Sequence, residues 1–189
     1  MTEEALVAFL EKRKGILDGV VITGGEPTLQ PDLPQLLEKI RGLGYRIKLD
    51  TNGGRPEVLR QLVEAGLVDY VAMDIKNSPA RYGDTVGIEG FALDKVEESI
   101  RYLLSGKVDY EFRTTVVKPL HDTASVQAMA RWLEQLGDGQ KIPRFFLQPF
   151  VDRDTVPVAG LSAPETQELE AYQAVLTPIC GDVTLRGVS

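Results

Sequence analysis

The chain has 189 residues, 43% of them apolar and 26% charged, a composition typical of a globular protein with a single domain over residues 1–189. Its net charge of −7 argues against nucleic-acid binding, which needs an excess of lysine and arginine. No apolar run is long enough to cross a bilayer, and the acidic start does not resemble a secretory signal, so we expect a cytoplasmic protein without a membrane partner.

Strand and helix signals alternate along the chain. Short apolar and β-branched runs predict strands at 19–23, 46–50, 70–74, 112–117, 144–148 and 183–186. Apolar residues at helical spacing predict an opening helix that ends by Gly15, then helices from Asp32 to Gly44 and from Pro56 to Gly66, and later ones beginning at Asp94, Ser125 and Ser162. We expect Asp32 to cap its helix, and the pairs Asp94 with Glu97 and Ser162 with Glu165 to form capping boxes.

This alternation predicts an α/β fold with parallel strands joined by right-handed crossovers. A partial or complete (β/α) barrel and a doubly wound sheet both fit the pattern. In either fold the active site lies at the carboxyl ends of the strands.

The residues that follow the predicted strands are polar, and they include two acids, a lysine, an arginine, an asparagine and a glutamine. Each feature alone has an ordinary interpretation: Gly24-Gly25 as a tight turn, Asp50 and Asp74 as caps, Lys76 and Arg113 as surface charges. Parallel strands would bring them to one rim, where carboxylates can receive an ammonium group and cations a carboxylate. The combination therefore favours a site for a zwitterionic ligand.

Three of these strand ends resemble a known family. Val21-Ile22-Thr23-Gly24-Gly25-Glu26-Pro27-Thr28 is similar to the GGE loop of radical S-adenosylmethionine (SAM) enzymes. Leu49 to Gly53 and Met73 to Lys76 resemble the next two strand ends of the glycyl-radical activating enzymes, most of all the anaerobic ribonucleoside-triphosphate reductase activating proteins. The ending from Val183 to Val188 is similar to that group as well, so the resemblance extends over essentially the whole chain.

The resemblance implies an incomplete parallel (β/α) barrel with a SAM site at its rim. In that family the glycine loop binds the methionyl amino group, and the residues carried over as a monovalent cation site are Asp50, Thr51 and Asp74. Arg113 and Thr115 would lie beside the ribose and adenine, and residues 148–151 would complete the rim. The full set of implied cofactor-binding residues is Gly24, Gly25, Glu26, Pro27, Asp50, Thr51, Asn52, Asp74, Lys76, Arg113, Thr115 and Gln148.

The chain departs from the family in its cysteines. The family holds a [4Fe-4S] cluster with a C-x3-C-x2-C loop that follows its first strand, and this chain contains neither that loop nor that strand. Its one cysteine, Cys180, cannot replace three thiolates, and we interpret it as a thiol of the core or of a helix end. We therefore expect a barrel with its first strand missing, with no catalytic residue of its own and inactive alone. The resemblance implies a glycyl-radical protein, such as anaerobic ribonucleotide reductase, as partner and a flavodoxin or ferredoxin as electron donor.

Two other hypotheses stay open. The chain could be a cluster-free SAM-binding or protein-interaction module, or a barrel enzyme in which Lys76 forms a Schiff base and Asp50 or Asp74 moves protons. The lone His121 is expected to be a solvated loop residue. We also expect strand 19–23 to be an edge strand, whose free side is covered by a neighbouring molecule, the opening helix or the chain end.

Overall fold

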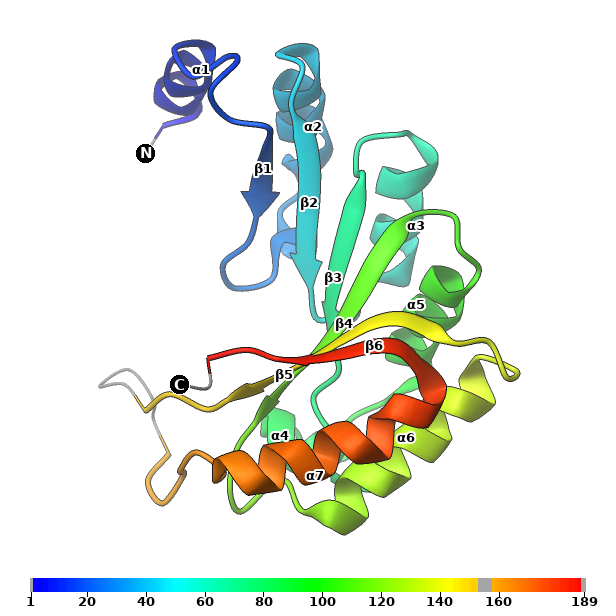
Figure 1. Cartoon of the computed structure of the whole chain (residues 1–189). Coiled ribbons are helices and arrows are strands. Elements are labelled where there is room, and N and C mark those ends of the chain that lie inside the picture. The colour runs from blue at the N-terminus through cyan, green and yellow to red at the C-terminus, as the bar shows by residue number, and fades with distance from the viewer. Residues whose placement is uncertain (1, 153–157, 188–189) are drawn as a thin grey trace.

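One sheet of six parallel strands organises the molecule, as seen in the computed structural model, which describes residues 2–152 and 158–187. The strand order follows the sequence, so each strand pairs with the strands before and after it in the chain. The strands are β1 (Gly19–Ile22), β2 (Arg46–Thr51), β3 (Tyr70–Asp74), β4 (Asp109–Val116), β5 (Ile142–Pro149) and β6 (Cys180–Leu185). Because β1 and β6 do not pair, the sheet is an open, partial barrel, as predicted (Figure 1).

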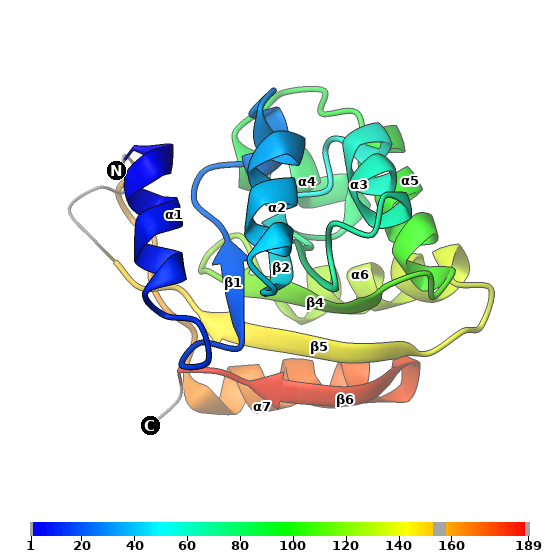
Figure 2. The ribbon, with the colours of Figure 1, turned by 90° about the horizontal axis from the view of Figure 1, so that it is seen from above.

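The first helix precedes the first strand, and the later helices connect the strands along the outer side of the curved sheet (Figures 1 and 2). They are α1 (Glu3–Glu11), α2 (Leu33–Gly42), α3 (Pro56–Glu64), α4 (Pro79–Val86), α5 (Asp94–Leu104), α6 (Thr123–Leu136) and α7 (Thr166–Leu176), with short 3-10 helices η1 (Pro27–Leu29) and η2 (Thr177–Ile179). The sequence patterns did not predict α4, which follows the polar end of β3. No helix in the described part of the chain is both long and apolar enough to span a bilayer.

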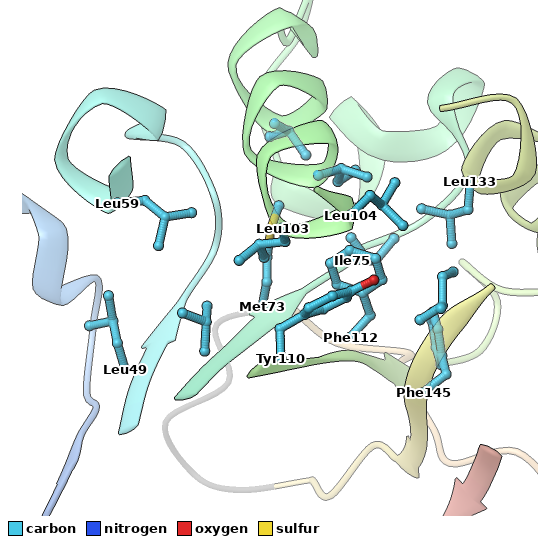
Figure 3. Close-up of a cluster of buried hydrophobic side chains, with 14 of the residues drawn as sticks. Leu49, Leu59, Met73, Ile75, Leu103, Leu104, Tyr110, Phe112, Leu133 and Phe145 are labelled. Carbon is cyan, nitrogen blue, oxygen red and sulfur yellow. The ribbon is translucent and has the colours of Figure 1, made fainter. Parts of the chain in front are cut away.

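The core lies between the sheet and these helices. Alternate residues of each strand point outward into it, so that Leu49 of β2, Met73 of β3 and Phe112 of β4 are fully buried (Figure 3). Leu59 of α3 and Leu103 of α5 meet them from the helical side. The apolar periodicity seen in the sequence is therefore the pattern of this outer face.

The inner face of the sheet is polar. Glu111 of β4 is only 3% exposed, and its carboxylate accepts hydrogen bonds from Lys48 Nζ at 3.1 Å and from the Tyr70 hydroxyl at 3.0 Å. Arg186, which follows β6, reaches the same carboxylate at 3.3 Å and so links the last strand to the centre of the sheet. Burial opposes ionisation, but Lys48, Tyr70 and Arg186 outweigh it and lower the pKa of Glu111.

Helix starts were predicted less well than the helices themselves. Asp32 precedes α2 without a side-chain capping bond, and Asp94 is the first residue of α5 rather than its cap, so these two capping predictions are wrong. The box predicted for Ser162 with Glu165 is also wrong, because α7 begins only at Thr166; Glu165 precedes the helix, and its backbone N–H donates to the Glu168 carboxylate at 2.8 Å. Residues that can cap a helix occur at several positions in these connections. Tertiary contacts decide at which of them the helix begins.

The strand β1 forms the edge of the sheet, as predicted. It pairs only with β2 among the described strands, and Val21 is 54% exposed. Helix α1 packs on α2 instead of pairing with β1, and the Tyr45 hydroxyl donates to the Leu10 carbonyl at 2.6 Å. The opening helix, one of the three covers that we expected for this edge, thus leaves Val21 exposed. Val188, at the end of the last motif, lies outside the described residues.

Candidate functional site

A small polar pocket lies at the carboxyl ends of β1, β2, β3 and β4. Its volume is about 150 Å³, and its lining residues are Thr23, Gly24, Gly25, Glu26, Asp50, Thr51, Asn52, Asp74, Lys76 and Arg113. Since the strands are parallel, the polar residues that follow each of them meet at one edge of the sheet. The polar residues predicted to share one rim thus form a pocket at the ends of the first four strands.

The glycine pair forms one wall of the pocket. Gly24 and Gly25 both have positive φ values, 95° and 48°, which residues with a side chain rarely adopt. Nothing lies within 4 Å of the position that a Cβ would take at either residue. The backbone of this loop therefore faces open space and allows a ligand to approach closely.

Glu26 ties this loop to β2. One carboxylate oxygen accepts hydrogen bonds from Thr28 Oγ1 at 2.6 Å and from Thr51 Oγ1 at 2.8 Å. The other oxygen accepts from the Asn52 backbone N–H at 2.6 Å. A carboxylate with these partners is a positioning group rather than a free base, so Glu26 holds the glycine loop against the end of β2.

Four charged side chains alternate in sign across the pocket. Arg113 donates from Nε to Asp74 at 2.9 Å and from a terminal nitrogen to Asp50 at 3.1 Å. Lys76 Nζ lies 2.9 Å from the second Asp74 oxygen. Burial alone would lower the pKa of Arg113. The carboxylates of Asp74 and Asp50 together have the larger effect, so the pKa is raised above its ordinary value.

The same contacts bear on the Schiff-base hypothesis for Lys76. A Schiff-base lysine needs a neutral amine, usually desolvated or placed beside another cation. The Lys76 side chain is instead 36% exposed and paired with a carboxylate. Lys76 therefore lacks the desolvated or cation-paired environment of a Schiff-base lysine, and nothing in the described site supports nucleophilic chemistry at this residue.

Three of the predicted site residues are not in the pocket wall. Pro27 is buried at the start of η1. Thr115 and Gln148 face each other across β4 and β5, where Gln148 Nε2 donates to Thr115 Oγ1 at 2.9 Å. They lie near the carboxyl ends of β4 and β5 and so continue the rim beyond the pocket.

A second, more apolar cavity adjoins the first and was missed by sequence reasoning. It measures about 450 Å³, shares Asn52 and Lys76 with the polar pocket, and is also lined by Gly54, Tyr82, Thr85, Val86, Ile88 and Phe91. The rings of Tyr82 and Phe91 stack with centroids 5.3 Å apart. Most of this wall belongs to α4 and the loop after it, which carry no strand-end motif.

The cluster implied by the resemblance does not fit the residues present. Cys180 is the first residue of β6, so it lies at the amino end of its strand, opposite to the pocket. It is buried, and burial raises the pKa of its thiol to about 12. Within residues 2–152 and 158–187, no three histidine, cysteine, aspartate or glutamate side chains are grouped to hold a metal ion. Cys180 therefore cannot be a ligand of a cluster placed at this pocket.

His121 is not the solvated residue that we predicted. Its side chain is buried, its Nδ1 lies 3.2 Å from the Val117 backbone nitrogen, and its Nε2 lies 2.9 Å from the Lys76 carbonyl oxygen. A neutral imidazole that accepts at Nδ1 and donates from Nε2 satisfies both contacts. His121 thus braces the segment that carries Lys76.

Comparisons with known proteins agree with this fold and site. Residues 1–133 match the model of the Radical SAM superfamily, so the chain belongs to that superfamily. It is similar to a Methanocaldococcus jannaschii protein assigned to the glycyl-radical enzyme activating enzymes, with 29% identity over 91% of this chain and 72% of that protein. It is also similar to 7-carboxy-7-deazaguanine synthase of Thermococcus kodakarensis, with 41% identity over 53% of this chain and 38% of that protein.

A solved structure supports the fold independently. A domain of pyruvate-formate lyase-activating enzyme from Bacteroides vulgatus superposes with a TM-score of 0.73. The match covers 90% of this chain and the whole of that domain at 19% sequence identity. The open sheet is therefore a radical SAM fold, and the similarity to activating enzymes holds over most of the chain.

Proposed function

We propose that this chain forms the SAM-binding part of an activating enzyme that generates a glycyl radical on a partner protein. An anaerobic ribonucleotide reductase is the partner class that its strand ends favour. In this family SAM supplies the reactive radical after a one-electron reduction, for which a flavodoxin or ferredoxin is the proposed electron donor. The residues of this chain bind and orient SAM, and the cluster must be held by cysteines other than Cys180.

The observation that carries this proposal is the composition of the polar pocket. Its volume of about 150 Å³ suits an amino-acid group rather than the whole of SAM. The charged side chains that line it are largely paired within the protein, which leaves the buried Asp50 Oδ1 and the open backbone of Gly24 and Gly25 to receive a zwitterionic ligand. The carbonyls of the glycine loop can receive the ammonium group, and the ribose and adenine would extend toward Thr115 and Gln148.

The test is SAM binding measured by isothermal titration calorimetry with a matched pair of glycine variants. Gly25→Ala adds a methyl group to the pocket wall, whereas Gly66→Ala adds one at a site with similarly positive φ and open surroundings at the end of α3. We expect Gly25→Ala to weaken binding by about tenfold or more, and Gly66→Ala to change it less than about twofold. No measurable binding by the native chain, or equal losses in both variants, would contradict the proposal.

The apolar cavity beside the pocket favours one second candidate, a radical SAM enzyme that acts on a small planar molecule. Phe91, which is partly exposed and stacks on the buried Tyr82, offers an aromatic surface for a flat ring next to the proposed SAM site. The similarity to a deazaguanine synthase points in the same direction. Binding of deazapurine compounds, measured with and without SAM, separates this candidate from an enzyme whose substrate is a protein.

A further inference from the structure

The four alternating charges of the polar pocket have a second consequence. Arg113 is mostly buried, with 17% of its side chain exposed, and it joins two carboxylates from different strands. Asp74 is its direct register partner across β3 and β4, and Asp50 comes from β2. The rigid sheet therefore fixes the guanidinium between the two aspartates, and its planar fork suits this bridging contact.

The residues implied for a monovalent cation have few oxygen atoms left to offer. Both oxygens of Asp74 are occupied, one by Arg113 and one by Lys76. The Thr51 hydroxyl donates to Glu26 and accepts from the Gly53 backbone N–H. Only Asp50 Oδ1, which is buried and has no hydrogen-bond partner in the described part of the chain, is free. Hard cations are held by several oxygen ligands, so this donor set does not fit a dissolved cation.

We propose that the Arg113 guanidinium takes the place of the monovalent cation, so that this pocket binds its ligand without any dissolved cation. The inference rests on the proposed function for the identity of the ligand, but not for the charge arrangement. Arg113 is a positioning residue in this account. It neutralises Asp50 and Asp74 together and keeps their carboxylates turned into the pocket.

Removing the guanidinium should create the cation site that the native chain lacks. In Arg113→Ala, Asp50 and Asp74 are left as two close carboxylates with only Lys76 to balance them, and they can attract a small cation. Potassium should then bind, whereas tetramethylammonium is too large to enter. Arg113→Lys keeps the charge and loses the fork, so it separates the effect of charge from that of geometry.

The first arm of the experiment measures thermal unfolding in KCl and in tetramethylammonium chloride at equal ionic strength. We expect the same melting temperature in both salts for the native chain and for Arg113→Lys. For Arg113→Ala we expect a melting temperature about 2–4 °C higher in KCl. The double variant Asp50→Asn with Arg113→Ala should lose this response, because one of the two carboxylates is gone.

The second arm measures SAM affinity in the same two salts. The native affinity should be unchanged, and that of Arg113→Ala should be about tenfold higher in KCl than in tetramethylammonium chloride. Potassium dependence in the native chain, or none in Arg113→Ala, would overturn the inference. If Arg113→Ala fails to fold, the native chain still decides the question by its own response to potassium. If no variant binds SAM, the proposed function fails, and the melting temperatures still test the role of Arg113.

Discussion

At the scale of single residues, the site depends on side chains that position other groups. Glu26 is the main example. Its motif resembles a ligand-binding loop, but its carboxylate accepts hydrogen bonds from Thr28, Thr51 and Asn52. The motif identifies a loop of the pocket, but the sequence does not show that two partners of the carboxylate, Thr51 and Asn52, lie at the end of the next strand. Its role follows from the parallel pairing of β1 with β2.

Glu26→Gln should loosen the pocket without removing any wall of it. The amide keeps one acceptor oxygen and presents a donor to N–H and O–H groups, so we expect a loss of about 1–3 kcal/mol in the free energy of unfolding and weaker SAM binding. Urea unfolding and calorimetry measure the two effects. The control is Glu57→Gln, which removes an exposed pair with Arg55 and should cost less than about 0.5 kcal/mol. Equal effects in both variants would show that Glu26 has no special role.

His121 provides a prediction about pH. Burial lowers the pKa of its imidazole from the ordinary value of 6.5, although hydrogen bonds to the Val117 and Lys76 backbone oppose the shift. The unfolded chain then binds a proton at a higher pH than the folded chain. Its contribution to stability is therefore complete above pH 6.5 and is lost as the pH falls from 6.5 to the folded pKa.

Because the chain contains one histidine, this titration can be followed without assignment. The imidazole proton signals in NMR should titrate with a midpoint below 6.5. A midpoint at or above the ordinary value would mean that the ring is solvated, as its sequence neighbours suggested. Nothing near His121 in the sequence points to Lys76, whose carbonyl is contributed by a segment 45 residues earlier.

At the scale of elements, the sequence predicted where the strands lie and which residues form their apolar face, but not how the charges on the other face pair. Apolar residues such as Leu49 and Met73 mark the outer face and locate the strands within a few residues. The inner face carries Lys48 and Glu111, two residues before Asp50 and Arg113 respectively. This spacing of two was the available signal, since it places both pairs on one side of the sheet. Which of these inner charges pair with each other depends on the register between strands.

The free edge of β1 should make the chain self-associate. Its unpaired side carries exposed backbone groups beside the apolar Val21. Val21→Glu places a charge on the inner face opposite Lys48 and should reduce association without a large loss of stability. Sedimentation over a range of concentrations measures this. Ile88→Glu changes a residue of similar exposure away from the edge and should have no effect, whereas a native chain that is monomeric throughout would contradict the prediction.

At the scale of the whole molecule, the chain has the fold of the family but not the three cysteines that hold the family's cluster. The open sheet and the polar pocket proposed to bind SAM are both present, while the one thiol of the sequence is buried at the other end of β6. The sequence predicted the open parallel sheet and brought the strand-end residues to one edge of it, because strand-end motifs can be read in linear order. It could not predict the apolar cavity, since α4 and its following loop carry no recognisable motif.

Anaerobic reconstitution of residues 1–189 with iron and sulfide should therefore leave no stoichiometric [4Fe-4S] cluster. One buried thiol with a pKa raised to about 12 cannot act as three thiolate ligands. Optical and electron paramagnetic resonance spectra measure the outcome. A cluster signal at one per chain would show that other side chains or a second molecule supply the ligands.

The short length and single partner of β1 also affect how the molecule fluctuates. Opening of residues 19–22 breaks hydrogen bonds to one strand only, and the same motion carries away the glycine loop and Glu26. Local opening and ligand occupancy are then mutually exclusive, so SAM should slow amide hydrogen exchange in β1 in proportion to its saturation of the pocket. The central strand β4, paired on both sides, should exchange slowly whether or not ligand is present. Hydrogen exchange in the edge strand β1 would in this way measure how much of the ligand site is occupied.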